Sequence, residues 1–335
     1  MSVELVEVYR GSTVESIHSG DLVVVNSKGD ILYQLGDPYK FTFWRSSAKP
    51  FQVLNLLEMG GTEAFNICGD ELALMCSSHG GEESHVDLVL KVLEKIGFRV
   101  NDLDCGISRP ISEEAYIKLL KESKALSVLN NACSGKHSGM LALCNLLDVD
   151  IKNYIDENHV VQQIMKEIIA DVADYKASDI AIAIDGCGVP VFGLPIYNMA
   201  LGYSRLTGGY NKSELRKKAL KQVQDAMVQH PFYVGGTNRL DTILMEETNG
   251  KVVAKFGAES VYCVGIVDKE IGFAMKTKDG SYRALKVIIP EVLRHLDYIT
   301  EEEFIAINSR LDLDVKNNRN EIIGHYKVPE GLLQK

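Results

Sequence analysis

The sequence lacks a long apolar stretch, a run of basic residues, a low-complexity segment and an internal repeat. No stretch approaches the roughly 18 apolar residues that a membrane-spanning helix needs, so a membrane location is not expected. The formal net charge of −10 argues against nucleic acid or an anionic membrane as a partner. The first residues carry acids where a signal peptide has an apolar core, so no secretory signal is expected.

Disulfide-forming patterns are also lacking, because the seven cysteines are odd in number and scattered over 335 residues. This usage is typical of free thiols in a reducing compartment, and we expect a cytoplasmic protein. Hydrophobic residues make up 46% and charged residues 24%, as in an ordinary soluble globular protein. No linker is evident, so residues 1–335 are expected to form one catalytic unit, built as one domain or two closely packed subdomains.

Hydrophobic periodicity predicts a mixture of helices and strands. Helices are expected from 46 to Gly60, at 70–76, 84–96 (with Ser84 and Asp87 as a capping box), 113–122, from 140 to 147, and at 160–172, 213–228 and 283–296. Strands are expected at 3–9, 23–25, 31–33, 41–44, 180–184 (a core strand), 241–245, 252–254, 260–267 and 270–276, with 268–269 as a turn. Strand–helix alternation is irregular, which favours an α+β fold with a largely antiparallel sheet packed against helices.

Ser46 and Lys49 stand at the expected start of a helix, and Pro50 fits its first turn. Residues at i and i+3 share a helix face, so the Lys49 amine is expected to reach the Ser46 hydroxyl. A lysine with a lowered pKa can take the proton of a serine and make it a nucleophile. Ser-x-x-Lys is equally typical of solvated helices, so the motif alone leaves both interpretations open.

Five polar, Gly- and Ser-bearing segments interrupt the apolar elements: 45–49, 76–85, 130–139, 185–190 and 255–259. Small residues at element ends let the backbone approach a ligand closely, and five such segments exceed what turn formation requires. In the second segment, Ser78 is a candidate for proton transfer or ligand binding, with helix capping as the structural alternative and Ser77 as a competitor. His79 and His85 are candidate ligands or bases, or hydrogen-bonded structural residues.

The segment 130–139 does not match a phosphate-binding loop, because Asn130 replaces the first glycine and His137 follows Lys136. Cys133 and Lys136 stand at i and i+3, and a distant turn offers Cys187. Two thiolates suit Zn²⁺, but a site needs more ligands, which Lys136, His137 or Asp185 could supply. Two buried, reduced cysteines are the alternative.

Lys255 follows the apolar residues 252–254 and so emerges from a strand that we expect to be buried. Desolvation there would lower the pKa of its amine and favour a proton-accepting form. The structural alternative is a lysine whose amine reaches solvent at the strand end.

Taken together, these segments resemble the thermolabile, bacterial-type L-asparaginase family, the class typified by the inducible rhizobial enzyme. The resemblance rests on five blocks in the family's order: Arg45–Gln52, Cys76–Glu82, Asn131–Met140, Asp185–Pro190 and Lys255–Glu259. It implies hydrolysis of L-asparagine to L-aspartate and ammonia, a homodimer, and an architecture similar to serine β-lactamases and glutaminases.

The resemblance also implies roles for individual residues. It pairs Ser46 with Lys49 and Ser78 with Lys255 as two catalytic Ser-Lys pairs. It assigns Zn²⁺ to Cys133, Lys136 and Cys187, as a metal that assists substrate binding and not the chemistry. We add Arg45, His137, Asp185 and Arg283 as candidates for binding the α-carboxylate and α-amino groups of the substrate.

The chain lacks Ser-Asp-Asn and Lys-Thr-Gly, so a β-lactamase mechanism cannot be transferred. The working hypothesis is that Lys49 takes the Ser46 proton and Ser46 attacks the amide, while Ser78 and Lys255 pass protons. The first rival hypothesis is a glutaminase or an enzyme that takes both amides, since one methylene is worth only about 1–3 kcal/mol of discrimination between substrates. The others are a non-catalytic zinc- or amino-acid-binding protein and a penicillin-recognising acyltransferase. Gly236-Thr237 and Thr207-Gly208-Gly209 offer only a faint match to threonine-dependent asparaginases.

Overall fold

A computed structural model describes residues 1–333, so the last two residues of the expected 1–335 unit lie outside it. The strands are β1 (Val3–Arg10), β2 (Thr13–Asn26), β3 (Ile31–Leu35), β4 (Phe41–Phe43), β5 (Ala181–Ile184), β6 (Pro190–Pro195), β7 (Val252–Gly257), β8 (Val261–Ile266), β9 (Ile271–Thr277), β10 (Asp314–Lys316) and β11 (Ile322–Lys327). The helices are α1 (Lys49–Gln52), α2 (Leu54–Glu58), α3 (Gly61–Ala64), α4 (Gly69–Met75), α5 (Glu83–Lys95), α6 (Glu113–Lys121), α7 (Ser134–Leu146), α8 (Val160–Ala173), α9 (Ile196–Ser204), α10 (Glu214–Gln229), α11 (Pro231–Gly235), α12 (Leu240–Glu247), α13 (Tyr282–His295) and α14 (Glu301–Arg310).

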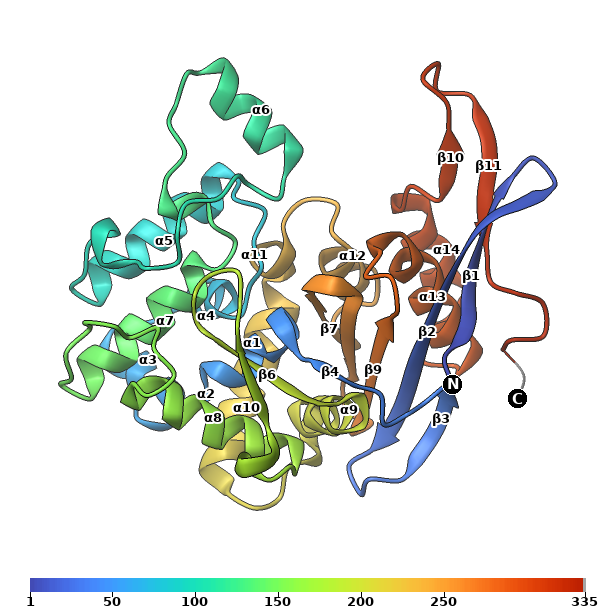
Figure 1. Ribbon diagram of the computed structural model, residues 1–335. Coiled ribbons are helices and arrows are strands. Elements are labelled where there is room, and N and C mark those ends of the chain that lie inside the picture. Colours follow the sequence, from blue (N-terminus) through green and yellow to red (C-terminus); the bar gives the residue numbers. More distant parts are fainter. Residues whose placement is uncertain (334–335) are drawn as a thin grey trace.

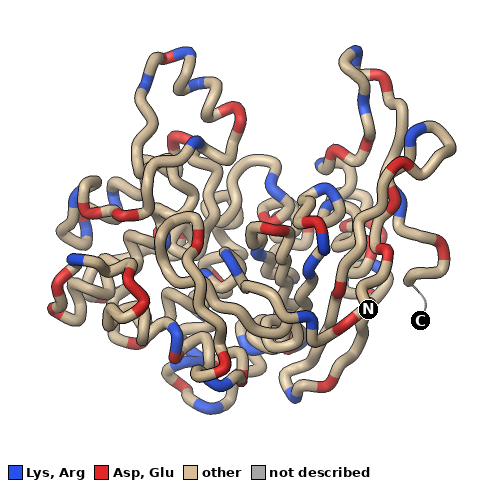
Figure 2. Tube along the Cα trace, in the orientation of Figure 1, with Lys and Arg blue, Asp and Glu red and all other residues tan. Residues whose placement is uncertain are grey.

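The main sheet is antiparallel throughout and runs β10-β11-β1-β2-β9-β8-β7, with β3 paired to β2. A second, three-stranded sheet runs β4-β6-β5 and is also antiparallel. Helices α1 to α8 and α10 gather on one side of the main sheet, and α13 and α14 lie on the other (Figure 1). Acidic and basic segments are intermingled along the chain (Figure 2). The expected α+β class with a largely antiparallel sheet is confirmed.

Two hydrophobic cores occupy the two faces of the main sheet. Along β2, Val23 and Val25 belong to the core beneath the helical region, whereas Leu22 and Val24 belong to the core beneath α12, α13 and α14. This assignment follows from the two-residue period of a strand, which sends successive side chains to opposite faces. Burial on both faces explains why residues 22–25 form a continuous apolar run instead of an alternating one.

Helix α9 crosses the sheet at very close range over two glycines. Gly265 of β8 and Gly272 of β9 are direct cross-strand partners. A Cβ atom at Gly272 would lie 1.8 Å from the Ala200 carbonyl oxygen of α9, and one at Gly265 would lie 2.5 Å from Thr207 Cγ2. The absence of side chains at this pair therefore sets the distance between the sheet and the helical region.

Several sequence predictions of elements are correct within two residues. The helices at 70–76, 84–96, 113–122, 160–172, 213–228 and 283–296 are all present, as are the strands at 3–9, 260–267 and 270–276. The strand expected at 252–254 is present but extends to Gly257, so Lys255 lies within it. The hairpin turn contains Gly29 with φ 90°, and Gly60, with φ 78°, follows the end of α2.

Other predictions are wrong. Residues 241–245 belong to helix α12, because the short apolar run 243–245 fits either period and packing on the second core selects the helix. The segment 180–184 supplies β5, an edge strand whose Ile184 is 80% exposed, and not a core strand. Helix α5 begins after Glu82 without a side-chain cap, so the Ser84–Asp87 capping box does not form.

The helix expected to start at Ser46 is broken into three pieces. A 3₁₀ helix (Arg45–Ala48) leads into α1, which has Pro50 in its first turn, and α2 begins after Val53. Strand β6, the strands β10 and β11, and helix α14 were not predicted. In residues 1–333, no helix has the length and apolar character to cross a membrane.

We expect Gly272→Ala to lower the free energy of unfolding by about 3 kcal/mol or more, because the new methyl group meets backbone atoms of α9 that cannot turn aside. Urea denaturation followed by circular dichroism measures this. Gly186→Ala is the control, since a Cβ there meets no atom within 4 Å. Equal stability of the two variants would contradict the close contact.

Candidate active site

Two buried lysines converge on the hydroxyl of Ser78. Lys49 Nζ lies 3.1 Å and Lys255 Nζ 3.0 Å from Ser78 Oγ. Lys49 is 1%, Ser78 5% and Lys255 0% exposed, so no bulk water competes for these hydrogen bonds. These residues come from the start of α1, the segment after α4 and the edge strand β7. We call Lys49, Ser78 and Lys255 the buried relay.

Lys49 also donates to the carbonyl oxygen of Ser77 and lies 3.4 Å from that of Ala132. With the Ser78 hydroxyl, these two carbonyls provide an acceptor for each of the three N–H bonds of an ammonium group. An ammonium at Lys49 leaves the Ser78 proton free to point at Lys255, which itself donates to the Phe256 carbonyl at 2.9 Å. Both amines are placed to donate to Ser78 Oγ, and the hydroxyl becomes a donor to Lys255 when that amine is uncharged.

Burial lowers the pKa of Lys255 to about 7, against the opposing effect of the Asp241 carboxylate. Asp241 Oδ2 lies 3.8 Å from Lys255 Nζ. Near neutral pH a substantial fraction of Lys255 is therefore an uncharged amine, which can accept the Ser78 proton.

Ser46 lies half-buried in the 3₁₀ helix, where its carbonyl accepts the Lys49 backbone N–H, and no hydrogen bond joins the two side chains. The side-chain contact expected between these residues is thus not formed, because the Lys49 chain extends instead to Ser78 and the two carbonyls. Arg45, just before Ser46, has φ 51°, a left-handed conformation that costs free energy for a non-glycine residue. A Cβ at Gly257 would lie 3.3 Å from Arg45 Cβ, which shows how closely the end of β7 approaches this turn.

The sulfur atoms of Cys133 and Cys187 and the amine of Lys136 come together from two distant segments. Lys136 Nζ lies 3.0 Å from Cys187 Sγ. A hydrogen bond from Cys187 lowers the pKa of the Cys133 thiol well below its ordinary value. Burial opposes the charge on Lys136, but the two sulfurs and Asp185 outweigh it and raise the pKa of the amine. Two sulfurs and one nitrogen form a donor set that suits Zn²⁺ and leaves one tetrahedral position for another ligand.

Helix α7 holds this donor set in place because it is buried along most of its length. A Cβ at Gly135 would lie 2.3 Å from the Leu74 carbonyl of α4. The Gly135-Lys136 pair therefore serves close helix packing, consistent with the rejection of a phosphate-binding loop.

Arg45 and Asp185 form an ion pair, with Nη2 2.9 Å and Nε 3.0 Å from Asp185 Oδ1. Burial raises the pKa of this carboxyl, but Lys136 and Arg45 more than compensate, so it is lowered overall. His137 lies deep in α7, where burial lowers the pKa of its ring, and Tyr154 Oη is 2.7 Å from Nδ1. The buried His137 Nε2 has no hydrogen-bond partner among residues 1–333.

The structure does not bring Arg283 to these groups. It is exposed on the first turn of α13, where its charge acts on Glu15 of the β1–β2 hairpin. Sequence reasoning also missed Asp241 and Tyr154. Asp241 had been placed in a strand, and nothing around Tyr154 marks it as a partner of a histidine 17 positions earlier.

His79 and His85 are held by structural hydrogen bonds. The Gly81 N–H donates to His79 Nδ1, so the proton of the neutral ring lies on Nε2, which is 2.9 Å from Ser134 Oγ. His85 Nε2 faces the Phe232 carbonyl at 3.0 Å, and the two imidazoles stack. Burial lowers the pKa of both rings, which favours their neutral forms.

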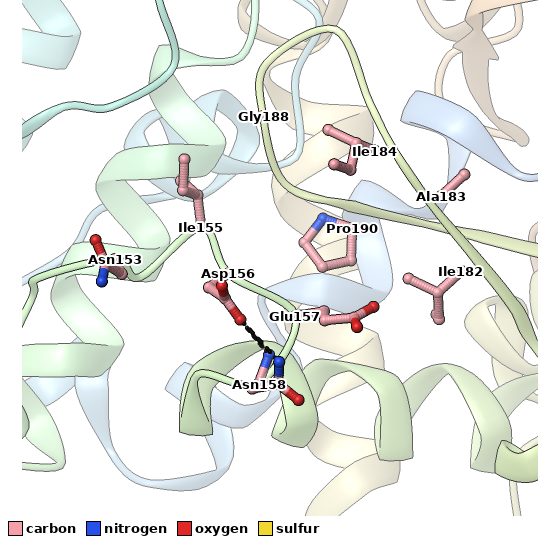
Figure 3. A pocket seen from close by; sticks show the side chains of 10 residues that line it. All are labelled: Asn153, Ile155, Asp156, Glu157, Asn158, Ile182, Ala183, Ile184, Gly188 and Pro190. Carbon is pink, nitrogen blue, oxygen red and sulfur yellow. Dashed lines mark hydrogen bonds between the residues drawn. The ribbon is translucent and has the colours of Figure 1, made fainter.

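A cavity of about 510 Å³ lies on the outer side of the 185–190 turn, and none of the candidate catalytic residues lines it. Ile182, Ile184 and Pro190 face Ile155 and Glu157 across it (Figure 3). The residues that line this cavity include Asp156 and Glu157 but no serine, cysteine or lysine.

Two buried amines and a serine hydroxyl thus lie in the same region as the Arg45–Asp185 ion pair, whose carboxylate feels the charges of Lys49 and Lys136. The sequence model of the L-asparaginase II family matches residues 6–328, and the chain belongs to this family. It is thus an asparaginase-type amidohydrolase that acts on a small-molecule substrate.

No curated protein matches the chain. Among solved structures, it is similar to a protein described as a beta-lactamase from Bacteroides dorei DSM 17855, with 12% identity over 78% of this chain and 87% of that chain. The TM-score of 0.41 is too low for this similarity to bear on the fold or the chemistry.

We expect the free energy of unfolding of the wild-type protein, minus that of the Lys255→Met variant, to rise by about 1.4 kcal/mol per pH unit between pH 7 and 10. Folded Lys255 loses its proton near pH 7, whereas the unfolded lysine keeps it to about pH 10.5, so the unfolded state binds more protons in this range. Urea titrations at several pH values measure the difference. Lys251→Met, which removes an exposed lysine just before β7, is the control. A flat difference curve for Lys255→Met would contradict the lowered pKa.

Proposed function

We propose that this amidohydrolase converts L-asparagine to L-aspartate and ammonia with Ser46 as the nucleophile. The proposal is carried by the single observation that Lys49 and Lys255 share the hydroxyl of Ser78 in a buried setting. An uncharged Lys255 draws the proton of Ser78, and Ser78 draws one from Lys49. The positive charge then rests on Lys255, and Lys49 becomes a neutral base one helical turn from Ser46.

In the next step Lys49 turns from its carbonyl acceptors to Ser46 and takes its proton, while Ser46 Oγ attacks the side-chain amide carbon. The first N–H groups of the 3₁₀ helix have no partner within it and are the proposed donors to the oxyanion. The relay then runs backwards, giving a proton to the departing ammonia, and water cleaves the acyl-enzyme by the same path.

The Arg45–Asp185 ion pair is suited to a zwitterionic substrate. A free amino acid carries one carboxylate and one ammonium group, which match the guanidinium of Arg45 and the carboxylate of Asp185. The unpartnered Nε2 of His137 offers a further hydrogen bond. Binding would exchange the internal ion pair for two intermolecular ones, so the charges remain compensated.

We propose that Cys133, Lys136 and Cys187 hold Zn²⁺. The metal, when bound, supplies positive charge for an oxygen of the substrate. The two thiolates and the neutral amine would hold it, with the buried Lys136 and Cys187 on one side and the half-buried Cys133 on the other. A homodimer and a cytoplasmic location, both expected from the sequence, remain predictions.

The test of the mechanism is an ammonia-release assay with asparagine and glutamine side by side. We expect Ser46→Ala to lower kcat at least about 10³-fold and Ser78→Ala about 10²–10⁴-fold, since each breaks one step of proton or acyl transfer. Ser77→Ala is the matched control, because its buried hydroxyl has no partner and its carbonyl is retained. We expect it to stay within a few-fold of wild type.

Acid quenching and mass spectrometry locate the acyl group, which we expect on Ser46. Acylation of Ser78, or turnover by Ser46→Ala, would overturn the assignment. A higher kcat/KM for glutamine than for asparagine would make the protein a glutaminase. A covalent adduct with a β-lactam would favour an acyltransferase. Zinc binding without ammonia release would favour a non-catalytic binding protein.

Zinc is tested by metal analysis after dialysis against buffered Zn²⁺. We expect about one bound ion per chain in the wild type and its loss in Cys133→Ser and Cys187→Ser, because thiolate ligands dominate such sites. The exposed Cys68→Ser is the control and should retain the ion. The KM for asparagine should rise in the ligand variants while kcat changes little; zinc retained by both would exclude this site.

A further inference from the structure

Asp241 is a buried carboxylate outside the set of residues that the sequence analysis selected. It is 2% exposed and lies in the first turn of α12, with Oδ2 3.8 Å from Lys255 Nζ. Its Oδ1 has no hydrogen-bond partner among residues 1–333. A carboxylate so placed is costly unless a nearby cation compensates it.

The start of α12 is fixed by contacts on both sides of Asp241. Thr242 Oγ1 donates to the Gly236 carbonyl at 2.8 Å, and the Leu240 N–H donates to Tyr282 Oη at 3.1 Å. The buried Tyr262 hydroxyl of β8 has no hydrogen-bond partner among residues 1–333, although the Asp241 charge acts on it. The start of α12 therefore cannot move away from Lys255 without disturbing its contacts with the end of α11 and with α13.

Other titratable groups act on Lys255 from several elements. They are Lys49 of α1, Arg239 before α12, Cys76 after α4, Cys133 before α7, Cys263 of β8 and, through Asp241, Tyr262. Lys49 and Arg239 carry positive charge and disfavour an ammonium at Lys255. In the described part of the chain, Asp241 is the carboxylate within ion-pair distance of the amine.

We propose that Asp241 is a positioning residue that acts through Lys255, as the buried counter-ion that holds the amine beside Ser78 and governs its protonation. Asp241 thereby sets the pH range in which the buried relay operates. The effect of Asp241 on the pH dependence of catalysis rests on the proposed function. The Asp241–Lys255 ion pair does not, because stability measurements test it without turnover.

The consequence for pH follows from the sign of the charge. With Asp241 ionised, the ammonium form of Lys255 is stabilised, so the amine releases its proton at a higher pH than burial alone would allow. Asp241→Asn keeps the shape of the side chain and removes the charge. Lys255 should then lose its proton at a pH at least about one unit lower, since two charges 3.8 Å apart interact strongly even at an effective dielectric constant near 20.

The first arm of the experiment measures unfolding by urea between pH 5 and 10. The contribution of Lys255 is the free energy of unfolding with Lys255 minus that of the matching Lys255→Met variant. In the Asp241→Asn protein, the rise of this difference with pH should begin at least about one pH unit lower than in wild type. Glu246→Gln is the matched control, because it removes an acid at the other end of α12 that pairs with Arg310. It should leave the onset unchanged.

The double variant Asp241→Asn/Lys255→Met keeps the test decisive if the single variant folds poorly, since it removes both charges together. We expect it to fold better than Asp241→Asn below pH 7 and to show no such pH dependence. Two results would overturn the proposal and leave Asp241 as a structural residue of α12. One is that the Lys255-dependent stability of Asp241→Asn begins to rise at the same pH as in wild type. The other is that Asp241→Asn loses the same stability whether Lys255 is present or absent.

The second arm measures kcat/KM for asparagine against pH. The acid limb should shift to lower pH in Asp241→Asn by the same amount as the stability onset, and not in Glu246→Gln. A shift in stability without any asparagine turnover would support the ion pair and reject the proposed function. Turnover with an unshifted acid limb would reject the role of Asp241 and retain the function.

Discussion

The structure depends on one arrangement: two lysine amines share a single serine hydroxyl inside the protein. Two buried ammonium groups so close to one hydroxyl would repel each other, and each would lack most of its hydration. The arrangement is stable when one amine, Lys49, is fully hydrogen-bonded and the other, Lys255, gives up its charge. A buried amine that loses its charge near neutral pH is thereby built into the structure beside a serine hydroxyl.

Glycines elsewhere in the fold support this arrangement, because they let neighbouring backbone segments pack closely together. Gly135 and Gly272 let α7 and α9 pack where a methyl group would collide, and a Cβ at Gly257 of β7 would lie only 3.1 Å from the Trp44 carbonyl oxygen. The segments that carry Cys133, Lys255 and Ser46 are thereby held at fixed distances. The polar segments in the sequence thus reflect two demands, since some of their glycines serve packing while the adjacent polar residues serve chemistry.

Elements with a strong period were predictable from the sequence, as α8 and α10 show, because their apolar faces leave no other choice. The segment 241–245 was not, because three consecutive apolar residues carry no period. The five polar segments were identified from the sequence, and the side chains of Cys133, Lys136 and Cys187, which come from two of them, interact in the structure. The partner of Lys49 was not predictable, because spacing within a helix favours Ser46, whereas the contact with Ser78 depends on how α4 packs against α1. Asp241 gave no signal, since its role appears only when α12 and β7 lie side by side.

Ser78 and Lys255 are separated by 177 positions, and this separation has a consequence for the newly made chain. On the ribosome, the helical region that contains Lys49 and Ser78 emerges long before β7. Until that strand arrives, the Ser78 hydroxyl lacks one of its two lysine partners. The buried relay is therefore complete only after residues 252–257 have been synthesised and β7 has joined the edge of the sheet.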